Sequence, residues 1–414
     1  IEWKEPRAST VALLEHYMYG TPPPRPPVRS TLRGTATVRK YCDRVSCVSL
    51  DSPATLRNYT LRVGPNASTL IPFDVFVYIP TASATTIKTT TTTTTTTTWP
   101  IVVYNGEGFD SGVEYGDLTA PGGAMLLNRG YAIAVFNRNE LRKDSKTAGG
   151  CGEPGCGMGA PDGVQLLYPE YSDWSTIGVW AWGAAVVVDF LLADARLSLL
   201  LDHGKVSSMG HSRGGKTALW HGATDERVAI TFPLMSGTGG CGALRVSTPI
   251  TKGEDGASQS VRNINREFPY WFTQRYHNFS RKESADGDAQ SNAPWDQHFQ
   301  RMLVAPRAQF GFEGIGNEHE NPVGSQATFH AAKVIYDWLN VTSKIGVFFH
   351  LCGHPMNDNS SHCDGSHEHD WKVVADFADF IHFHKQPANT SLFNTTAYAT
   401  HAPYSWAAPT TPPA

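Results

Sequence analysis

The sequence of 414 residues has no excess of positive charge and no clean apolar run long enough to span a bilayer. Lysine and arginine together number 34 against 38 acidic residues, which gives a formal net charge of −4. This balance predicts no basic surface for nucleic acid or for anionic lipid. The best apolar run, Val179–Leu201, contains Asp189, Asp194 and Arg196. We therefore expect a buried helix there and no membrane span.

Cysteine is also scarce, with seven residues in the chain. Three pairs are close enough in sequence to be candidate disulfides, namely Cys42/Cys47, Cys151/Cys156 and Cys352/Cys363. This scheme leaves Cys241 unpaired, and the odd count requires either a free thiol or a different pairing, since connectivity does not follow from sequence. The chain starts at Ile1 without a methionine, which fits a processed, secreted protein.

Seven N-x-S/T sequons support an extracellular or secretory compartment, because such asparagines are acceptors for N-glycans on surface loops. The candidate acceptors are Asn58, Asn66, Asn278, Asn340, Asn359, Asn389 and Asn394.

A low-complexity segment, residues 81–98, interrupts two expected strands and contains ten consecutive threonines. A run of this kind has too little apolar surface to order itself and is typical of O-glycosylated segments. The candidate O-glycan acceptors are Thr89, Thr90, Thr91, Thr92, Thr93, Thr94, Thr95, Thr96, Thr97 and Thr98. We expect residues 1–388 to form one domain with this loop inserted, followed by a Thr/Pro-rich tail at 389–414.

The remaining chain alternates between strand-like and helix-like patterns. A helix is expected at Ser9–Tyr19, followed by three strands that suggest an antiparallel opening to the sheet, Thr35–Tyr41, Tyr59–Val63 and Phe73–Pro80. From Trp99 the expected order is strand Ile101–Asn105, helix Ala124–Arg129, strand Tyr131–Phe136, helix Trp174–Ala193, a strand ending near Gly210 with its following helix, strand Ala229–Leu234, helix Ala327–Leu339, strand Ile345–His350 and helix Asp370–His384. This alternation predicts a mainly parallel α/β sheet with helices on both faces.

The most informative motif is Gly210-His-Ser-Arg-Gly214, which lies between a strand-like run and a helix-like run. In that context G-x-S-x-G forms a nucleophile elbow, the sharp turn of the α/β-hydrolase fold. Ser212 is the expected nucleophile, and the backbone N–H of Arg213 would face an oxyanion at the positive end of the helix. Lys216 follows Ser212 by about one helical turn, so its ammonium could reach a bound substrate.

A serine hydrolase also needs a histidine base and an orienting carboxylate. In α/β-hydrolases the histidine comes last, after the final strand, and His354 fits this place because it follows the strand Ile345–His350. His362, His367 and His369 lie close to one another, but their spacing matches no standard zinc signature. We therefore expect no metal and no organic cofactor.

An ordered series of runs in this sequence resembles the glucuronoyl esterases, carbohydrate esterase family 15, most strongly the bacterial-type branch. The matching runs are His16–Gly20, Leu126–Ala134, Trp174–Ala184, Gly210–Trp220, Ser236–Arg245, Phe268–Phe272, Asp296–His298, Ala305–Arg307, Asn321–Ser325 and Gly353–His354. The resemblance covers nearly the whole chain and is far more specific than the pentapeptide alone.

The resemblance implies cleavage of the ester between a xylan-borne (4-O-methyl)glucuronic acid and a lignin alcohol, so plant cell-wall glucuronoxylan or a similar uronate ester is the expected partner. Ser212 would attack the carbonyl, His354 would shuttle the proton, and the N–H and guanidinium of Arg213 would stabilise the oxyanion. Lys216 would bind sugar hydroxyls, with Gln259 and Glu267 as further candidates.

The triad acid departs from the family pattern. Family members carry it either just before the Ser-Gly that follows the next strand, where this chain has Met235, or in the loop before Asn/Asp-Pro, where it has Asn317. Glu318, one residue further on, is the predicted replacement, with Glu320 and Glu313 as alternatives. The family's sugar-stacking tryptophan in that loop corresponds to His319.

Three functions stay open on the sequence alone. The first is a secreted carbohydrate esterase. The second is an esterase-derived structural glycoprotein with weak or no activity, such as one subunit of a self-assembling, glycan-coated extracellular assembly or fibril. The altered acid, the threonine run and the sequons favour it. The third is an acetyl-xylan or other small-acyl esterase, because fold alone does not decide function.

Overall fold

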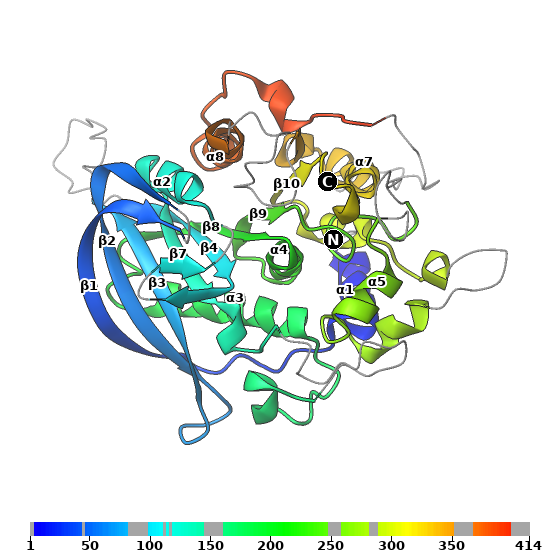
Figure 1. Cartoon of the computed structure of the whole chain (residues 1–414), viewed down its shortest axis with the longest axis horizontal. Helices are drawn as coiled ribbons and strands as arrows, with labels where there is room; N and C mark the ends of the chain where they lie inside the picture. Colours follow the sequence, from blue (N-terminus) through cyan, green and yellow to red (C-terminus); the bar gives the residue numbers. More distant parts are fainter. Residues whose placement is uncertain are drawn as a thin grey trace.

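The computed structural model describes residues 4–43, 46–81, 98–110, 113–115, 118–144, 160–246, 258–280, 289–351 and 367–398. Their centre is a nine-stranded sheet with the strand order β1-β2-β3-β7-β4-β8-β9-β10-β11, seen in Figure 1. The strands are β1 (Arg29–Cys42), β2 (Cys47–Val63), β3 (Ile71–Pro80), β4 (Trp99–Gly106), β7 (Ala132–Asn137), β8 (Leu201–His211), β9 (Val228–Leu234), β10 (Ala308–Gly314) and β11 (Ile345–His350). Two short strands, β5 (Gly108–Asp110) and β6 (Val113–Tyr115), pair separately.

The sheet has an antiparallel part and a parallel part, as the sequence predicts. Strands β1, β2, β3 and β7 pair antiparallel, whereas β7, β4, β8, β9, β10 and β11 run parallel. Strand β1 forms an edge that carries Arg29, Arg33, Arg39 and Lys40, and charges on an edge strand oppose pairing with another chain. The expected disulfide Cys42–Cys47 closes the β1–β2 turn.

Helices cover both faces of the sheet. The α-helices of the described residues are α1 (Lys4–Leu14), α2 (Ala120–Asn128), α3 (Thr176–Ala193), α4 (Arg213–Thr224), α5 (Val261–Glu267), α6 (His298–Val304), α7 (Pro322–Trp338) and α8 (His367–Phe383). Residues of α2 and α8 share one hydrophobic cluster with the sheet, and residues of α1, α3 and α4 share another. Figure 1 shows α2 and α8 on one side of the sheet and α3 on the other. The predicted three-layer α/β-hydrolase architecture is therefore confirmed.

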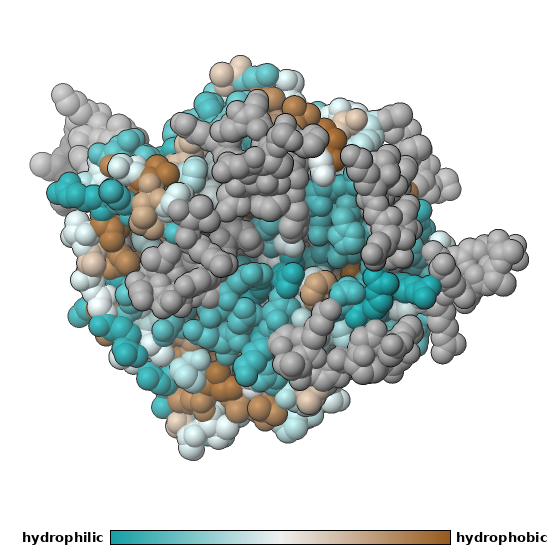
Figure 2. All heavy atoms as spheres, in the orientation of Figure 1, coloured by the Kyte–Doolittle hydropathy of each residue, from teal (hydrophilic) through white to brown (hydrophobic). Residues whose placement is uncertain are grey.

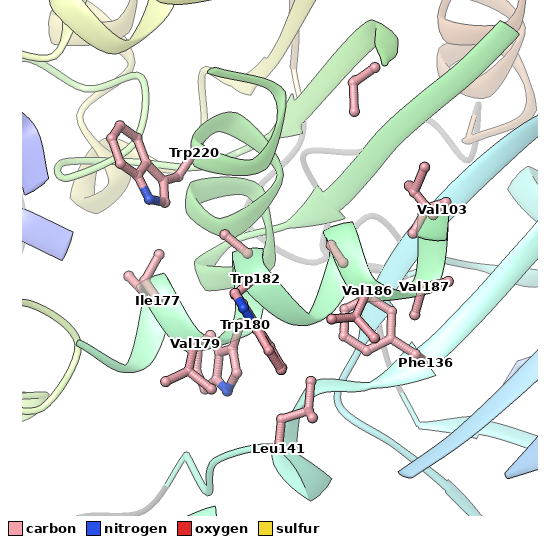
Figure 3. Packing of buried hydrophobic residues seen from close by; sticks show 14 of the residues in the cluster. Val103, Phe136, Leu141, Ile177, Val179, Trp180, Trp182, Val186, Val187 and Trp220 are labelled. Carbon is pink, nitrogen blue, oxygen red and sulfur yellow. The ribbon is translucent and has the colours of Figure 1, made fainter. Parts of the chain in front are cut away.

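Helix α3 shows why the long apolar run is a core helix. Ser175 caps its start, with the side chain accepting a hydrogen bond from the Gly178 N–H at 3.2 Å, and such caps stabilise a helix by about 1 kcal/mol. Figure 3 shows its side chains close to Val103 and Phe136 of the sheet. Among the described residues it is the one helix long and apolar enough to cross a membrane, but 83% of it is buried inside the fold.

The structure also contains elements that the sequence patterns do not predict. Helix α6 and strand β10 occupy residues for which no element was expected, and helix α7 begins at Pro322, five residues before the expected start at Ala327. The first helix likewise begins earlier, at Lys4, and ends in a π-helical turn, Glu15–Tyr19.

The stretch 389–398, expected to begin the tail, packs against the domain. Phe393 is 8% exposed within the α8-side cluster, and the Thr395 N–H donates to the Val347 carbonyl of β11 at 3.0 Å. The Gln326 side chain of α7 accepts from the N–H groups of Ala397 and Tyr398.

Candidate active site

Ser212 lies in the turn between β8 and α4 with a strained backbone. Its φ of 54° and ψ of −122° are rare for a residue with a side chain, and such conformations cluster at functional sites. The surrounding chain holds it, because the Ser212 N–H donates to the Leu234 carbonyl of β9 at 2.9 Å. The Ser212 hydroxyl makes no capping bond to α4. The turn at Ser212 thus has the strained backbone that the motif predicts.

The two glycines of the motif are needed for close packing around this turn. A Cβ on Gly210 would collide with the Gly214 carbonyl oxygen and with the Asn105 side chain. The Asn105 amide in turn donates to the carbonyls of Met209 and Gly214 at 3.0 and 3.1 Å. The glycines therefore allow β4, β8 and α4 to meet directly beneath Ser212.

Arg213 is the first residue of α4, and its guanidinium is held on several sides. Its Nη1 lies 2.6 Å from the Asp144 carboxylate, and its side chain is 28% exposed. Its guanidinium carbon lies 4.9 Å from the Phe268 ring centroid and 5.0 Å from that of Trp271. Burial alone would lower the pKa of Arg213, but the Asp144 charge and hydrogen bond outweigh it and raise the pKa.

Lys216 lies one turn further along α4 and is almost fully buried, at 1% exposure. Its ammonium donates to the Ser236 carbonyl at 2.7 Å and to the Gln259 side-chain oxygen at 3.4 Å, and it lies 4.0 Å from the Glu320 carboxylate. Burial lowers the pKa of Lys216, and the Glu320 charge opposes this shift. The structure thus brings together two of the predicted sugar-binding residues, Lys216 and Gln259.

The other two predicted sugar-binding residues lie at the surface. Glu267 is the last residue of α5 and is half-buried, with its carboxylate 3.1 Å from the Arg266 guanidinium. His319 is exposed, and its carbonyl accepts from the Gln259 N–H at 2.7 Å. This bond joins the loop after β10 to the segment that carries Gln259.

The candidate acids have different environments. Met235 is fully buried with a φ of 42°, so the first family position has no carboxylate. Glu318 begins the 3-10 turn Glu318–Glu320 and is half-buried. Glu320 packs against Lys216 and against Gly237, where a Cβ would collide with its carboxylate.

Glu313 is 1% exposed within β10, and burial raises its pKa to about 8 despite the charge of Arg301. Glu313 is therefore mostly protonated at pH 7.

His354 and the candidate disulfides Cys151/Cys156 and Cys352/Cys363 lie outside the described residues, as do Asn359 and Thr89–Thr97. The Ile315 N–H donates to the carbonyl of His350, the last residue of β11, at 2.9 Å. The carboxyl ends of β10 and β11 therefore lie side by side, and the loop that carries Glu318 begins there. Cys241 is buried and free, and the described residues contain no group of acidic, histidine and cysteine side chains fit for a metal.

A cavity of about 250 Å³ lies at the opposite end of α4. Its lining includes Trp182, Trp220 and Thr224. Thr224 is the last residue of α4, whereas Ser212 immediately precedes its first residue. The cavity is thus separated from the nucleophile by the length of the helix, and it plays no part in the site around Ser212.

The sheet order, the covered faces and the strained serine between a parallel strand and a helix define an α/β-hydrolase. Residues 83–340 match the family described as "Glucuronyl esterase, fungi", which is more than half of the chain. The chain therefore belongs to the glucuronoyl esterase family, whose members are carboxylic ester hydrolases.

Individual relatives come from prokaryotes and from fungi. The chain is 30% identical over 285 residues to the carbohydrate esterase MZ0003 from an unknown prokaryotic organism, a match that covers 62% of this chain and 58% of that protein. It is 24% identical over 397 residues to the 4-O-methyl-glucuronoyl methylesterase 1 of Wolfiporia cocos, covering 95% and 79%. The first of these matches thus spans less than two thirds of the relative's length.

Solved structures share the fold. A family 15 glucuronoyl esterase from Caldicellulosiruptor kristjansonii superposes with a TM-score of 0.71 at 23% identity, covering 99% of this chain and 92% of that one. A serine-to-alanine mutant of the Sporotrichum thermophile glucuronoyl esterase, in complex with methyl 4-O-methyl-β-D-glucopyranuronate, gives a TM-score of 0.64 at 19% identity over 95% of this chain and 86% of that one.

Proposed function

We propose that this chain is a secreted serine esterase that hydrolyses glucuronate esters of plant cell-wall xylan through an acyl-enzyme. The observation that carries the proposal is Ser212, held at a φ of 54° at the start of α4 with Arg213 and Lys216 beside it. A backbone strain of this size costs about 1 to 3 kcal/mol and is characteristic of nucleophile elbows. The family to which the chain belongs supports the same chemistry.

In the proposed reaction the Ser212 hydroxyl oxygen attacks the uronate carbonyl carbon, and its proton passes to His354. The Arg213 N–H and guanidinium stabilise the negative oxygen of the tetrahedral intermediate. His354 then gives the proton to the leaving alcohol, and the acyl-enzyme forms. A water molecule then attacks the acyl carbonyl with the same proton transfers through His354, which releases the uronic acid and restores Ser212. Glu318 orients His354 by accepting a hydrogen bond from its ring.

The sugar ring is proposed to bind beside Lys216, Gln259 and Glu320. Lys216 and Gln259 already form one hydrogen-bonded group, so a sugar hydroxyl would meet donors and acceptors that need little rearrangement. Glu267 and His319 would contribute from the rim. The described surface near α4 in Figure 2 is mainly hydrophilic, which suits a polar ligand.

The test is hydrolysis of benzyl glucuronate by the purified protein. We expect Ser212→Ala to lower kcat by at least about 10³-fold, because removal of a nucleophile leaves only binding and oxyanion stabilisation. Ser208→Ala is a suitable control. It removes a buried serine of β8 whose hydroxyl lies 2.9 Å from His221, and it should cost about 1 kcal/mol of stability with kcat unchanged. No turnover by folded protein, together with no labelling by a fluorophosphonate, would exclude a serine esterase.

A second candidate function is an esterase-derived structural glycoprotein with weak activity. Met235 at the first acid position favours it, because a missing orienting carboxylate can lower kcat by about 10⁴-fold. Five sequon asparagines are exposed, namely Asn66, Asn278, Asn340, Asn389 and Asn394. Asn58 is less suitable, since it lies half-buried in β2 between β1 and β3. Mass measurement before and after deglycosylation of secreted protein would test the glycans, and acetylated xylan would test the small-acyl alternative.

A further inference from the structure

We propose that Asp144 is a positioning residue for the reaction, and that it fixes the Arg213 guanidinium beside the reacting ester. The inference rests on the proposed function, because it assigns a role to the residue that holds the proposed oxyanion group. Asp144 follows β7 by seven residues and lies 68 positions before Ser212 in the sequence. The fold nevertheless places its carboxylate against the first side chain of α4.

The carboxylate of Asp144 is itself held by fixed donors. Its Oδ1 accepts from the Tyr270 hydroxyl at 2.8 Å and from the Trp271 indole N–H at 3.1 Å. Its Oδ2 accepts from the Arg213 Nη1 at 2.6 Å. With one oxygen bound to two aromatic residues, the other is aimed at the guanidinium in a single direction. The Asp144 side chain is only 6% exposed, so water competes little for these bonds.

Two stacked rings lie beside the guanidinium. The ring centroids of Phe268 and Trp271 lie 3.8 Å apart, and the interplanar angle is 3°. The Arg213 guanidinium carbon lies about equally far from both centroids. Trp271 therefore contacts Arg213 through its ring and Asp144 through its N–H. The same residue couples the ion pair to the aromatic stack, so the guanidinium has few other orientations available.

The charges near Arg213 show what Asp144 prevents. Glu107 lies 3.9 Å from the Arg213 Nε and also pairs with Arg138. Burial would raise the pKa of Asp144, but the guanidinium groups of Arg213 and Arg138 hold it below its usual value. Asp144 is therefore ionised at neutral pH. Without its charge, Glu107 would be the nearest remaining anion for Arg213, and the guanidinium would turn away from its present position.

The first test compares Asp144→Asn with wild type in benzyl glucuronate hydrolysis. Asparagine keeps the shape and removes the charge. We expect kcat to fall by about 10- to 100-fold, the range seen for outer-shell groups that orient metal ligands. KM should change less than about threefold, because the affected interaction belongs to the transition state. In an Arg213→Gln background the same change should lower kcat by less than about twofold, because the group that Asp144 positions is already gone.

Asp225→Asn is a closely matched control at the other end of α4. Asp225 is 5% exposed at its side chain and lies 2.6 Å from the Arg227 guanidinium, as Asp144 does from Arg213. Both substitutions remove one buried Arg–Asp pair and should lower the melting temperature, but only Asp144→Asn should lower kcat. If Asp144→Asn folds poorly, Tyr270→Phe removes one donor from the Asp144 carboxylate and should give a smaller loss of kcat in the same direction.

A readout that needs no turnover separates this inference from the proposed function. In the wild type the Arg213 guanidinium should show slowly exchanging side-chain N–H signals by NMR, assigned by their loss in Arg213→Gln. We expect Asp144→Asn to abolish these signals and Asp225→Asn to retain them. Two results would overturn the positioning role. One is that the Arg213 N–H signals persist in Asp144→Asn. The other is that Asp144→Asn lowers kcat equally in the wild-type and Arg213→Gln backgrounds. An inactive wild type with the expected NMR result would overturn the proposed function alone.

Discussion

The buried carboxyl of Glu313 gives a prediction whose size follows from the structure. It lies on β10 at 1% exposure. Burial raises its pKa from the ordinary 4.5 to about 8, the neighbouring Glu320 acts in the same direction, and Arg301 and Lys216 oppose the shift. Glu313 was one of three candidate triad acids, but a carboxyl that keeps its proton at pH 7 is unsuited to accept a hydrogen bond from histidine as an anion.

Between pH 4.5 and 8 the native state retains a proton on Glu313 that the unfolded chain releases. The stability associated with this group is therefore fully present below pH 4.5 and is lost as the pH rises through 8. The loss is about 1.4 kcal/mol per pH unit, and it reaches about 4 kcal/mol at pH 8. Glu313→Gln cannot ionise, so the variant should equal the wild type near pH 4.5 and exceed its unfolding free energy by up to about 4 kcal/mol at pH 8.

The assay is urea unfolding of both proteins at several pH values from 5 to 8, with kcat measured on the same samples. Glu226→Gln serves as a control, because Glu226 is 75% exposed in its pair with Arg7 and its removal should change stability by less than about 0.5 kcal/mol at every pH. We expect Glu313→Gln to keep kcat within about threefold of wild type. A stability difference that does not change with pH would refute the assigned protonation state, and a loss of kcat near 10⁴-fold would identify Glu313 as the triad acid.

Two further predictions concern the candidate active site around Ser212. Ser212→Gly should raise the unfolding free energy by about 1 kcal/mol, because glycine adopts a φ of 54° without strain; urea unfolding measures this, and an unchanged or lower stability would contradict it. Glu318→Gln should lower kcat by up to about 10⁴-fold with KM nearly unchanged, if it orients His354. Steady-state kinetics on benzyl glucuronate would decide, and wild-type kcat in this variant would remove Glu318 from the triad.

Much of the fold could be predicted because local signals agreed with the final structure. The motif around Ser212 combines two glycines with a strand before it and a helix after it, and each feature has a separate physical cause. The apolar runs of β4, β7 and β11 are buried on both faces, which gives parallel strands an unbroken hydrophobic pattern. The element boundaries were less accurate, since helix ends such as Pro322 depend on the preceding loop.

Strand β10 was missed because its composition conceals it. Its seven residues include Gly311, Gly314, Gln309 and Glu313, yet all seven are buried. Two glycines and two polar side chains weaken the strand pattern in the sequence. The polar groups are accepted only because neighbouring elements surround them, as Arg301 of α6 does near Glu313. Such compensation is a tertiary property, which the sequence of β10 alone does not contain.

The candidate site was predictable in part for the same reason. Ser212, Arg213 and Lys216 follow from one helix start, so their relative placement is local. Asp144 comes from a separate loop and has no motif around it. The run Phe268–Phe272 was recognised as a family feature, but its contact with Arg213 depends on how the segment after α5 packs against the start of α4. The choice among Glu313, Glu318 and Glu320 as triad acid depends on how deeply each carboxyl is buried and on where it points. The sequence of residues 313–320 does not contain that information.

The left-handed backbone of Ser212 also bears on the history of this chain. A strained serine lowers stability without improving packing, and a change to glycine would remove the strain in a single substitution. In a lineage that used the fold only as a scaffold, random substitution would be free to erase such a residue, and stability would favour its loss. This chain retains the serine, the close-packed glycines on either side of it and the Asn105 amide beneath the turn. That combination is what the proposed ester chemistry at Ser212 requires.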